Sequence, residues 1–148
     1  MAVPDKLTDT LETLEMVADR SERIQLLIDL AGRFEEVPAR LARRPFAKEH
    51  LVPACESEAY VFGEERPDGS LDFHFAVENP QGISAKAMAV ILGDALSGAP
   101  AGQVAQVPQD IVYRVFGPEL SMGKSMGLMS MVGMVAAIAR KQAEAKSS

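Results

Sequence analysis

The stretch AYVFGEERPDGSLDFHFAV, residues 59–77, decides the fold class of this chain. In its second half apolar and polar side chains alternate, and this period of two is typical of a half-buried strand. Pro67 and Gly69 interrupt the pattern at places that favour a tight reversal. Residues 59–62 precede the reversal, so the stretch predicts an antiparallel hairpin. One face of the second strand is expected to carry Leu71, Phe73, Phe75 and Val77, and the other Asp72, His74 and Glu78.

Helical spacing dominates on the N-terminal side of this hairpin. Apolar residues within residues 8–18 recur at that spacing and predict a first short helix. Asp19 and Glu22 form a capping-box pattern, which predicts the start of a second helix, and Pro38 stops it. Its apolar stripe must pack on something, so both helices are expected to cover the sheet. The stripe consists of Ile24, Leu27, Ile28 and Ala31.

A third helix is predicted directly after the hairpin. Residues 79–82 end the hairpin, and Ser84 can then cap a helix that runs to Leu96 and is closed by Gly98. Residues 111–116 are β-branched like a strand but form only a short run, so their periodicity fits a strand or a helix.

The last predicted helix extends from about Ser125 to Ala145. One side of it is expected to carry Met126, Met129, Val132 or Gly133, Ala136 and Ala137. With strands in one block and helices in others, the pattern indicates an α+β fold with helices packed on one face of a small antiparallel sheet. Residues 1–148 are expected to form a single domain, which is the usual size for 148 residues.

Charge and cysteine usage limit the classes of partner and the compartment. The net charge is −6 and the isoelectric point is about 4.9, so the overall field repels nucleic acid and anionic lipid. A single thiol survives best in a reducing compartment, and residues 1–5 carry no basic or apolar leader pattern. No apolar run is expected to approach the 18 or so residues that span a bilayer. These features predict a cytoplasmic protein that binds neither nucleic acid nor a membrane.

One local exception to the acidic balance is a basic cluster. It comprises Arg40, Arg43, Arg44 and Lys48. Such a cluster can dock on an acidic protein surface, but more commonly it is a solvated face.

Cys55, the only cysteine, is the main candidate for chemistry. It lies just before the first predicted strand and follows Pro53, which holds the chain extended. A lone cysteine is most often a small buried apolar residue. Its neighbours Glu56 and Ser57 instead favour an accessible thiol, whose reactivity depends on thiolate formation.

Other chemistries fit the sequence less well. A cysteine hydrolase would need His50 or His74 beside Cys55, although true Cys-His pairs usually join separate elements and His50 is close in sequence. One cysteine and two separated histidines cannot form a tetrahedral zinc site unaided. Before Lys124, Gly117 stands one position too early for a phosphate-binding loop. No metal or other cofactor is therefore expected.

The C-terminal helix is rich in methionine. Methionines at helical spacing usually pack in a core, but they can also form an adaptable groove for a peptide. The residues are Met122, Met126, Met129, Met131 and Met134.

Three segments together resemble the SufE family. Residues 19–31, DRSERIQLLIDLA, resemble the helix that opens these proteins, and residues 51–57, LVPACES, resemble their Val-x-Gly-Cys-x-Ser loop. Residues 121–128, SMGKSMGL, follow the pattern Ser-x-x-Arg-x-x-Gly-Leu. The order and spacing of the three segments fit over nearly the whole chain.

This resemblance implies a sulfur acceptor that stimulates a SufS-like, pyridoxal-phosphate-dependent cysteine desulfurase. Cys55 would take the persulfide and deliver its sulfur to a SufBCD-like iron-sulfur scaffold complex. A fold similar to that of IscU-type scaffolds is implied too, and it makes residues 111–116 a helix. The residues implied to bind the partner are Glu56, Ser57, Ser121, Lys124, Gly127 and Leu128.

The chain departs from the family pattern at four places. Ala54 replaces the glycine before the cysteine, and Lys124 replaces an arginine whose bidentate fork lysine does not reproduce. Tyr60 or Val61 stands where tryptophan is common, and residues 78–81 replace an Asp-Ala pair.

Three rival functions remain for comparison. An iron-sulfur scaffold would need several thiolate ligands, and this chain has one. A noncatalytic interaction module could use the methionine-rich helix as its groove. A cysteine hydrolase could use His50 as its base.

Overall fold

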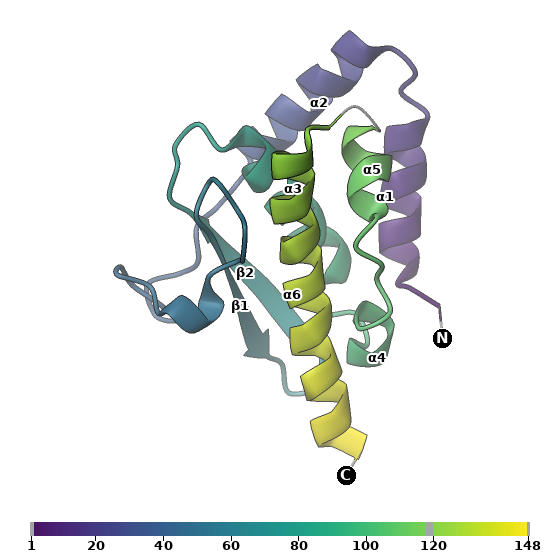
Figure 1. Cartoon of the computed structure of the whole chain (residues 1–148). Coiled ribbons are helices and arrows are strands. Elements are labelled where there is room, and N and C mark those ends of the chain that lie inside the picture. Colours follow the sequence, from purple (N-terminus) through teal and green to yellow (C-terminus); the bar gives the residue numbers. More distant parts are fainter. Residues whose placement is uncertain (1, 118–119, 148) are drawn as a thin grey trace.

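The computed structural model describes residues 2–117 and 120–147, and Figure 1 shows a two-stranded sheet with the α-helices gathered on one side of it. The elements are α1 (Asp5–Glu15), α2 (Arg20–Gly32), the short 3-10 helix η1 (Lys48–His50), β1 (Ala59–Glu65), β2 (Leu71–Val77), α3 (Ile83–Leu96), α4 (Ala101–Val104), α5 (Ile111–Phe116) and α6 (Met122–Ser147). This is the α+β arrangement that the sequence predicted.

The predicted hairpin is confirmed. Strands β1 and β2 pair antiparallel, with Val61 opposite Phe75. The Arg66 amide donates to the Ser70 carbonyl at 2.8 Å across the reversal, and Gly69 adopts a φ of +89°. Glycine is favoured there because side-chain-bearing residues rarely adopt positive φ.

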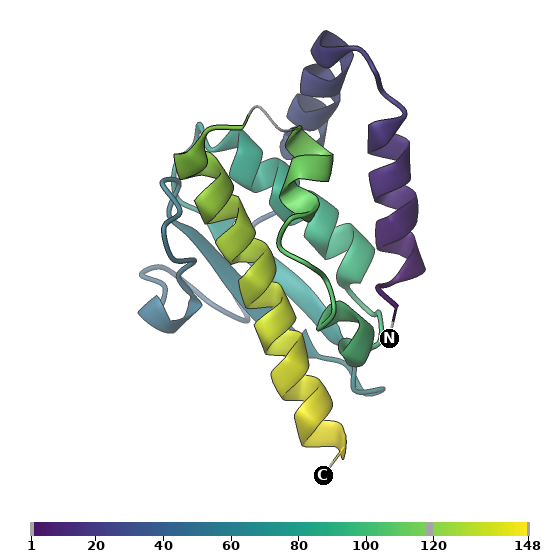
Figure 2. The same cartoon turned by 45° about the vertical axis from the view of Figure 1, so that its right-hand side comes forward.

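One face of the sheet packs against α6 and α3. Helix α6 contacts β1, whereas α3 contacts β2. Nine of the 14 residues of α3 are buried, so this helix is apolar on nearly all sides. It must therefore be covered by the sheet on one side and by other helices on the opposite side. One expectation is corrected here. Helix α2 packs mainly on α3, and α1 packs equally on α3 and α5, so neither helix has the sheet as its main partner. Figure 2 shows α1 and α2 as an outer layer.

The second face of the sheet is covered by the segment between α2 and β1, in which η1 is the one short helix among the described residues. Val37, Phe62 and Ala76 form a small buried cluster there. The ring of Phe46 lies 5.5 Å from that of Phe62. Helices therefore pack on one face of the sheet, as predicted, while this connecting segment seals the other.

Two of the four residues in the predicted basic cluster are paired with acidic side chains. Arg40 binds Glu64, and Arg44 binds both Glu36 and Glu78. Hydrogen bonds from Arg40 and then His74 lower the pKa of Glu64 to about 2. Much of this positive charge is neutralised within the fold, which favours the solvated-face interpretation over a docking patch.

Several predicted helix limits and faces needed correction. The first helix begins at Asp5 and ends at Glu15, three residues earlier at each end than predicted. Residues 111–116 are helical, as the family resemblance implied. Helix α3 begins at Ile83 after Gly82, and no side chain caps it, so the Ser84 cap was wrong.

The predicted apolar faces of α2 and α6 were only partly right. Leu27 is buried on α2, but Ile24 and Ile28 are exposed. On α6, Met126 and Ala137 are exposed. Helical spacing groups residues on a side, but tertiary contacts decide which side is covered. The buried stripe of α6 contains Leu128, Met131, Val132, Val135, Ala136 and Ala139.

Helix α6 also meets the length and composition criteria for a membrane span. An 18-residue window within residues 122–146 has a mean hydropathy of 1.4, which overturns the expectation that no apolar run would approach this length. A long core helix meets the same criteria, and 44% of the apolar window of α6 is buried within the fold.

The Arg23 guanidinium ties α2 to the ends of two other helices. It donates to the Leu14 carbonyl of α1 at 2.7 Å and to the Arg114 and Val115 carbonyls of α5 at 3.0 and 3.1 Å. Carbonyls at helix C-termini lack intrahelical partners and carry partial negative charge. One cation therefore satisfies the ends of two helices while it holds α2.

Replacing Arg23 with alanine should lower the free energy of unfolding by about 1–3 kcal/mol, because charge-assisted hydrogen bonds to the three carbonyls are lost. Urea unfolding followed by circular dichroism measures the change. The matched control is Arg33→Ala, which removes only the exposed ion pair with Asp94 and should change stability by less than about 0.5 kcal/mol. Equal effects of the two substitutions would contradict a special role for Arg23.

Candidate functional site around Cys55

Cys55 lies in a tight turn directly before β1. The Glu58 amide donates to the Cys55 carbonyl at 3.1 Å, and the Val52 amide donates to the Ala59 carbonyl at 2.8 Å. Leu51 forms an isolated antiparallel bridge with Tyr60. The turn is thus an extension of the sheet edge, and the backbone fixes where the thiol lies.

Two residues without glycine's freedom adopt left-handed backbone conformations in this turn. Ala54 has a φ of +60° and Glu58 a φ of +50°. Such values cost an L-residue roughly 1–2 kcal/mol. The Ala54 conformation gives a physical reason for the glycine that the family pattern places before the cysteine.

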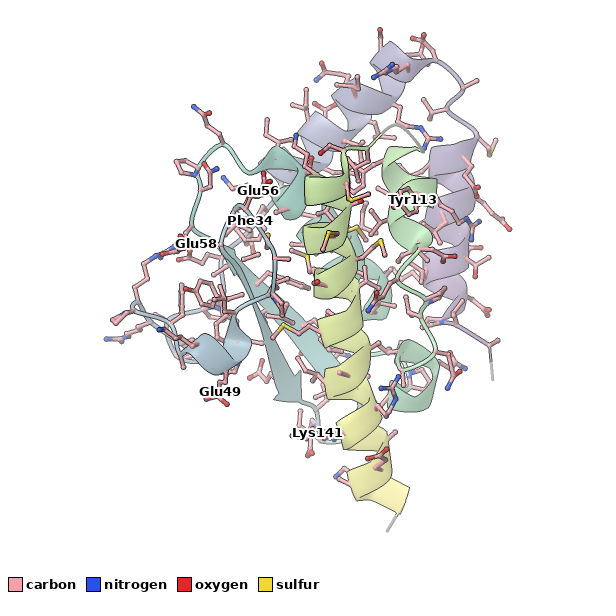
Figure 3. All side chains as sticks on the ribbon, viewed as in Figure 1. Phe34, Glu49, Glu56, Glu58, Tyr113 and Lys141 are labelled. Carbon is pink, nitrogen blue, oxygen red and sulfur yellow. The ribbon has the colours of Figure 1, made fainter. Side chains whose placement is uncertain are left out.

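Three glycines let neighbouring elements approach this turn closely. A Cβ atom at Gly127 of α6 would lie 2.9 Å from Cys55 Cα, and one at Gly82 would lie 2.8 Å from Ser57 Oγ. At Gly123 a Cβ atom would lie 2.8 Å from Glu56 Oε1. At separations below 3.0 Å something must shift. At Gly123 and Gly82 the nearest atoms belong to side chains, whereas at Gly127 they are backbone atoms of the turn, so a side chain at Gly127 would push the turn itself away. Figure 3 shows Glu56 beside the first turn of α6.

The Cys55 side chain is half-buried and borders a cavity of about 140 Å³. The turn that carries the thiol forms one wall, and the first turns of α3 and α6 form the others. Cys55 also packs against the main core. The thiol is therefore neither fully exposed nor sealed inside the molecule.

Five of the six residues implied to bind a partner line this cavity with Cys55. Glu56 and Lys124 are exposed, whereas Gly127 and Leu128 are buried. Ser57 is intermediate in exposure. Leu128 is only 3% exposed, so it forms the cavity wall and part of the core.

Ser121, the sixth of these residues, does not line the cavity. Its hydroxyl accepts from the Lys124 amide at 3.4 Å, and its carbonyl accepts from the Ser125 amide at 2.9 Å. The first of these is a weak N-cap contact. Ser121 thus helps to begin the helix that carries Lys124.

The histidines lie away from Cys55. His50 Nδ1 lies 3.1 Å from the Val61 carbonyl oxygen, and its ring packs 4.4 Å from that of Phe62 on the second face of the sheet. His74 pairs with Glu64. Within residues 2–117 and 120–147, no hydrogen bond joins either histidine to Cys55, and no group of three His, Cys, Asp or Glu side chains could hold a metal ion. This geometry does not support the hydrolase hypothesis.

Sequence reasoning missed the α3 side of the cavity. Asn79, Gln81, Gly82 and Ile83 line it, and the Asn79 side-chain oxygen accepts from the Gln81 amide at 2.9 Å. The Asn79 amide donates to the Ser57 carbonyl at 3.2 Å. The available signal was the turn-forming stretch at residues 79–82, which was interpreted as the end of the hairpin and as a departure from the family's Asp-Ala pair, without a role at the site.

The residues around Cys55 fall within a known family domain. A family model described as the Fe-S metabolism associated domain SufE matches residues 8–139, which include the Cys55 turn, the start of α3 and the start of α6. The chain belongs to the SufE family. SufE domains are associated with iron-sulfur metabolism.

The fold is also found in a solved relative. The solution structure of a hypothetical protein from Thermus thermophilus is similar, with a TM-score of 0.74 and 25% sequence identity. The alignment covers 97% of this chain and 98% of that one. No curated protein matches the sequence significantly.

Substituting Gly127 with alanine should destabilise this SufE-family protein and displace the Cys55 turn. The added methyl group would meet backbone atoms of Ala54 and Cys55, which cannot rotate away as a side-chain end can. Thermal unfolding should show a lower midpoint, and amide chemical shifts around Cys55 should change.

The control for Gly127→Ala is Gly93→Ala in the middle of α3. Its added Cβ would find only ordinary contacts, the nearest at 3.7 Å. Alanine exceeds glycine in helix propensity by about 1 kcal/mol, so this control should be neutral or stabilising. A stabilising Gly127→Ala would show that the contact with the Cys55 turn is not restrictive.

Proposed function

We propose that this protein is a sulfur acceptor, which takes sulfur from a cysteine desulfurase on Cys55 and delivers it to iron-sulfur cluster assembly. The observation that carries the proposal is the position of the only thiol. Cys55 sits half-buried at a cavity whose walls are three segments of the matched family domain. Membership in a family associated with iron-sulfur metabolism supports the same role.

The transfer needs no oxidant and no cofactor on this chain. The Cys55 thiolate attacks the outer sulfur of a persulfide on the desulfurase, and a new sulfur-sulfur bond forms at Cys55. The donor's sulfur-sulfur bond breaks, and its electron pair leaves with the donor cysteine as a thiolate. No second cysteine exists in the chain to discharge the product as an internal disulfide, so Cys55 can carry the sulfur to an acceptor.

We propose a SufS-like desulfurase as the donor and a SufBCD-like scaffold complex as the acceptor. Glu56, Ser57 and Lys124 offer polar contacts around the cavity, while Gly127 and Leu128 shape it. Ser121 contributes by positioning Lys124. The cytoplasm, where such partners and a reduced thiol would coexist, is the proposed location.

An interaction module without sulfur chemistry is the second candidate. Met122 and Met126 at the start of α6 are 78% and 52% exposed, and flexible methionines suit adaptable binding surfaces. Such a module would bind a partner without using Cys55.

Incubation with its cognate desulfurase and cysteine should add sulfur to Cys55 and raise the rate of alanine release. Removal of sulfur from the donor cysteine frees it for another turnover. Intact-mass spectrometry should show at least one added sulfur atom, lost on treatment with a thiol reductant, and peptide mapping should place it on Cys55.

The control is Cys55→Ser, which should bind the desulfurase but neither gain sulfur nor stimulate it. If Cys55→Ser stimulates as well as the parent, the acceptor proposal is wrong and the interaction module takes its place. Absence of added sulfur from the parent with an active cognate desulfurase would have the same consequence.

Replacing Lys124 with alanine should weaken desulfurase stimulation severalfold, whereas Lys124→Arg should preserve it. Lys124 is exposed and forms no ion pair with any residue in the described parts of the chain, so its charge is available to a partner. Titration of alanine release against protein concentration measures the effect, and the melting temperature of Lys124→Ala should stay near the parent value. An unchanged titration curve would assign Lys124 to the solvated surface.

A further inference from the structure

A second and larger depression lies beside the Cys55 cavity. Its volume is about 840 Å³, and its walls come from the chain joining α1 to α2, from α2, from α5 and from the start of α6. Figure 2 shows α2 projecting at one end of the molecule, with α1 and α5 below it. We call this depression the α2–α5 groove.

The groove exposes apolar side chains that the fold itself does not cover. Ile24 of α2 and Tyr113 of α5 line it and are 49% and 40% exposed, and Leu27 contributes to its floor. Figure 3 shows Tyr113 on α5. Phe116 of α5 and Leu120 line it too and are partly buried. Concentrated exposed apolar area of this kind marks binding surfaces in soluble proteins.

Basic side chains outnumber acidic ones among the described residues of the groove wall, although the protein has a net negative charge. Among the described residues of its wall, Glu15 is the only acidic one. Arg114 pairs with Glu15, and Arg23 also attracts that carboxylate while its guanidinium donates to backbone carbonyls, so one carboxylate faces two arginines. The basic wall residues are Arg20, Arg23, Arg114 and Lys124. An occupant with carboxylates beside apolar side chains complements this surface.

Lys124 joins the groove to the site of chemistry, because it lines both the α2–α5 groove and the Cys55 cavity. A chain segment lying in the groove would therefore end beside the thiol. Arg23 ties α2 to α1 and α5, so the groove exists before any partner arrives. A preformed surface binds at a lower cost in conformational entropy.

We propose that the α2–α5 groove docks the sulfur donor, the cysteine desulfurase, through a donor segment that presents apolar side chains flanked by carboxylates. This inference rests on the proposed acceptor function and adds a second docking surface to the residues around Cys55. The groove would supply affinity and orientation, while the Cys55 turn would supply the chemistry.

The test compares two substitutions on the same helix. Ile24→Glu places a carboxylate in the groove, whereas Ile28→Glu places one a turn further along α2, at a residue that is 42% exposed but does not line the groove. Both sites tolerate glutamate, a good helix former, so both variants should fold, as thermal unfolding can verify. Binding of the desulfurase is measured by calorimetry with full-length protein in the Cys55→Ser background, so that no sulfur moves during the titration.

Ile24→Glu should raise Kd by about tenfold or more, and Ile28→Glu should change it by less than about twofold. Binding of the parent should weaken as salt is raised from about 50 to 500 mM, because the proposed contact includes opposite charges. With Cys55 restored, Ile24→Glu should require more protein for half-maximal stimulation but reach the parent's maximal rate of alanine release.

The outcomes separate this inference from the proposed function. If the parent takes sulfur on Cys55 while Ile24→Glu binds with the parent Kd, the groove is not the docking surface but the acceptor function stands. Equal weakening by Ile28→Glu would also overturn the groove assignment, and salt-independent binding would overturn an acidic donor segment. If the parent neither binds the desulfurase nor takes its sulfur, the proposed function fails, and the docking inference fails with it.

Discussion

The close contact between α6 and the Cys55 turn is the constraint on which the site depends. At Gly127 the helix backbone lies so near Cys55 Cα and the Ala54 carbonyl that there is no room for a methyl group. Because glycine has no side chain, two segments far apart in sequence can lie in direct contact here. Met131 and Val132 anchor α6 in the core. Because α6 contacts the Cys55 turn, the packing of the core also fixes where the thiol lies.

The same contact explains the unusual backbone of the turn. With β1 fixing the chain after Glu58 and α6 limiting the space beside Cys55, the turn must reverse within a few residues. Ala54 and Glu58 do so with positive φ values, and the surrounding hydrogen bonds from Val52 and Glu58 hold them there. Strain of this kind persists only where the structure around it leaves no alternative. The backbone conformation of the turn is therefore determined more by the neighbouring elements than by the residues of the turn.

Local patterns predicted the parts of the fold that local interactions determine. The hairpin followed from alternation and from Gly69, and the start of α2 from Asp19, whose carboxylate accepts from the Glu22 amide at 3.2 Å. The exposed faces could not be predicted this way, because Ile24 and Met126 fit an apolar stripe as well as buried residues do. Cys55 was identified as the only cysteine and Lys124 through the family resemblance, but their convergence on one cavity depends on long-range packing.

The exposure of α2 follows from the layering of the fold. Helix α3 occupies the middle layer and needs only one strip of cover from α2, which Leu27 and Ala31 supply. Leu26 and Leu30 also pack partly against the core, whereas Ile24 and Ile28 are left exposed by this domain. Arg23 holds α2 near its N-terminus, while exposed apolar residues remain on another side of the helix. Burial of these residues would add stability only when another surface covers them. Because that side opens toward Lys124 and the Cys55 cavity, the incomplete cover of α2 belongs to the same end of the molecule as the thiol.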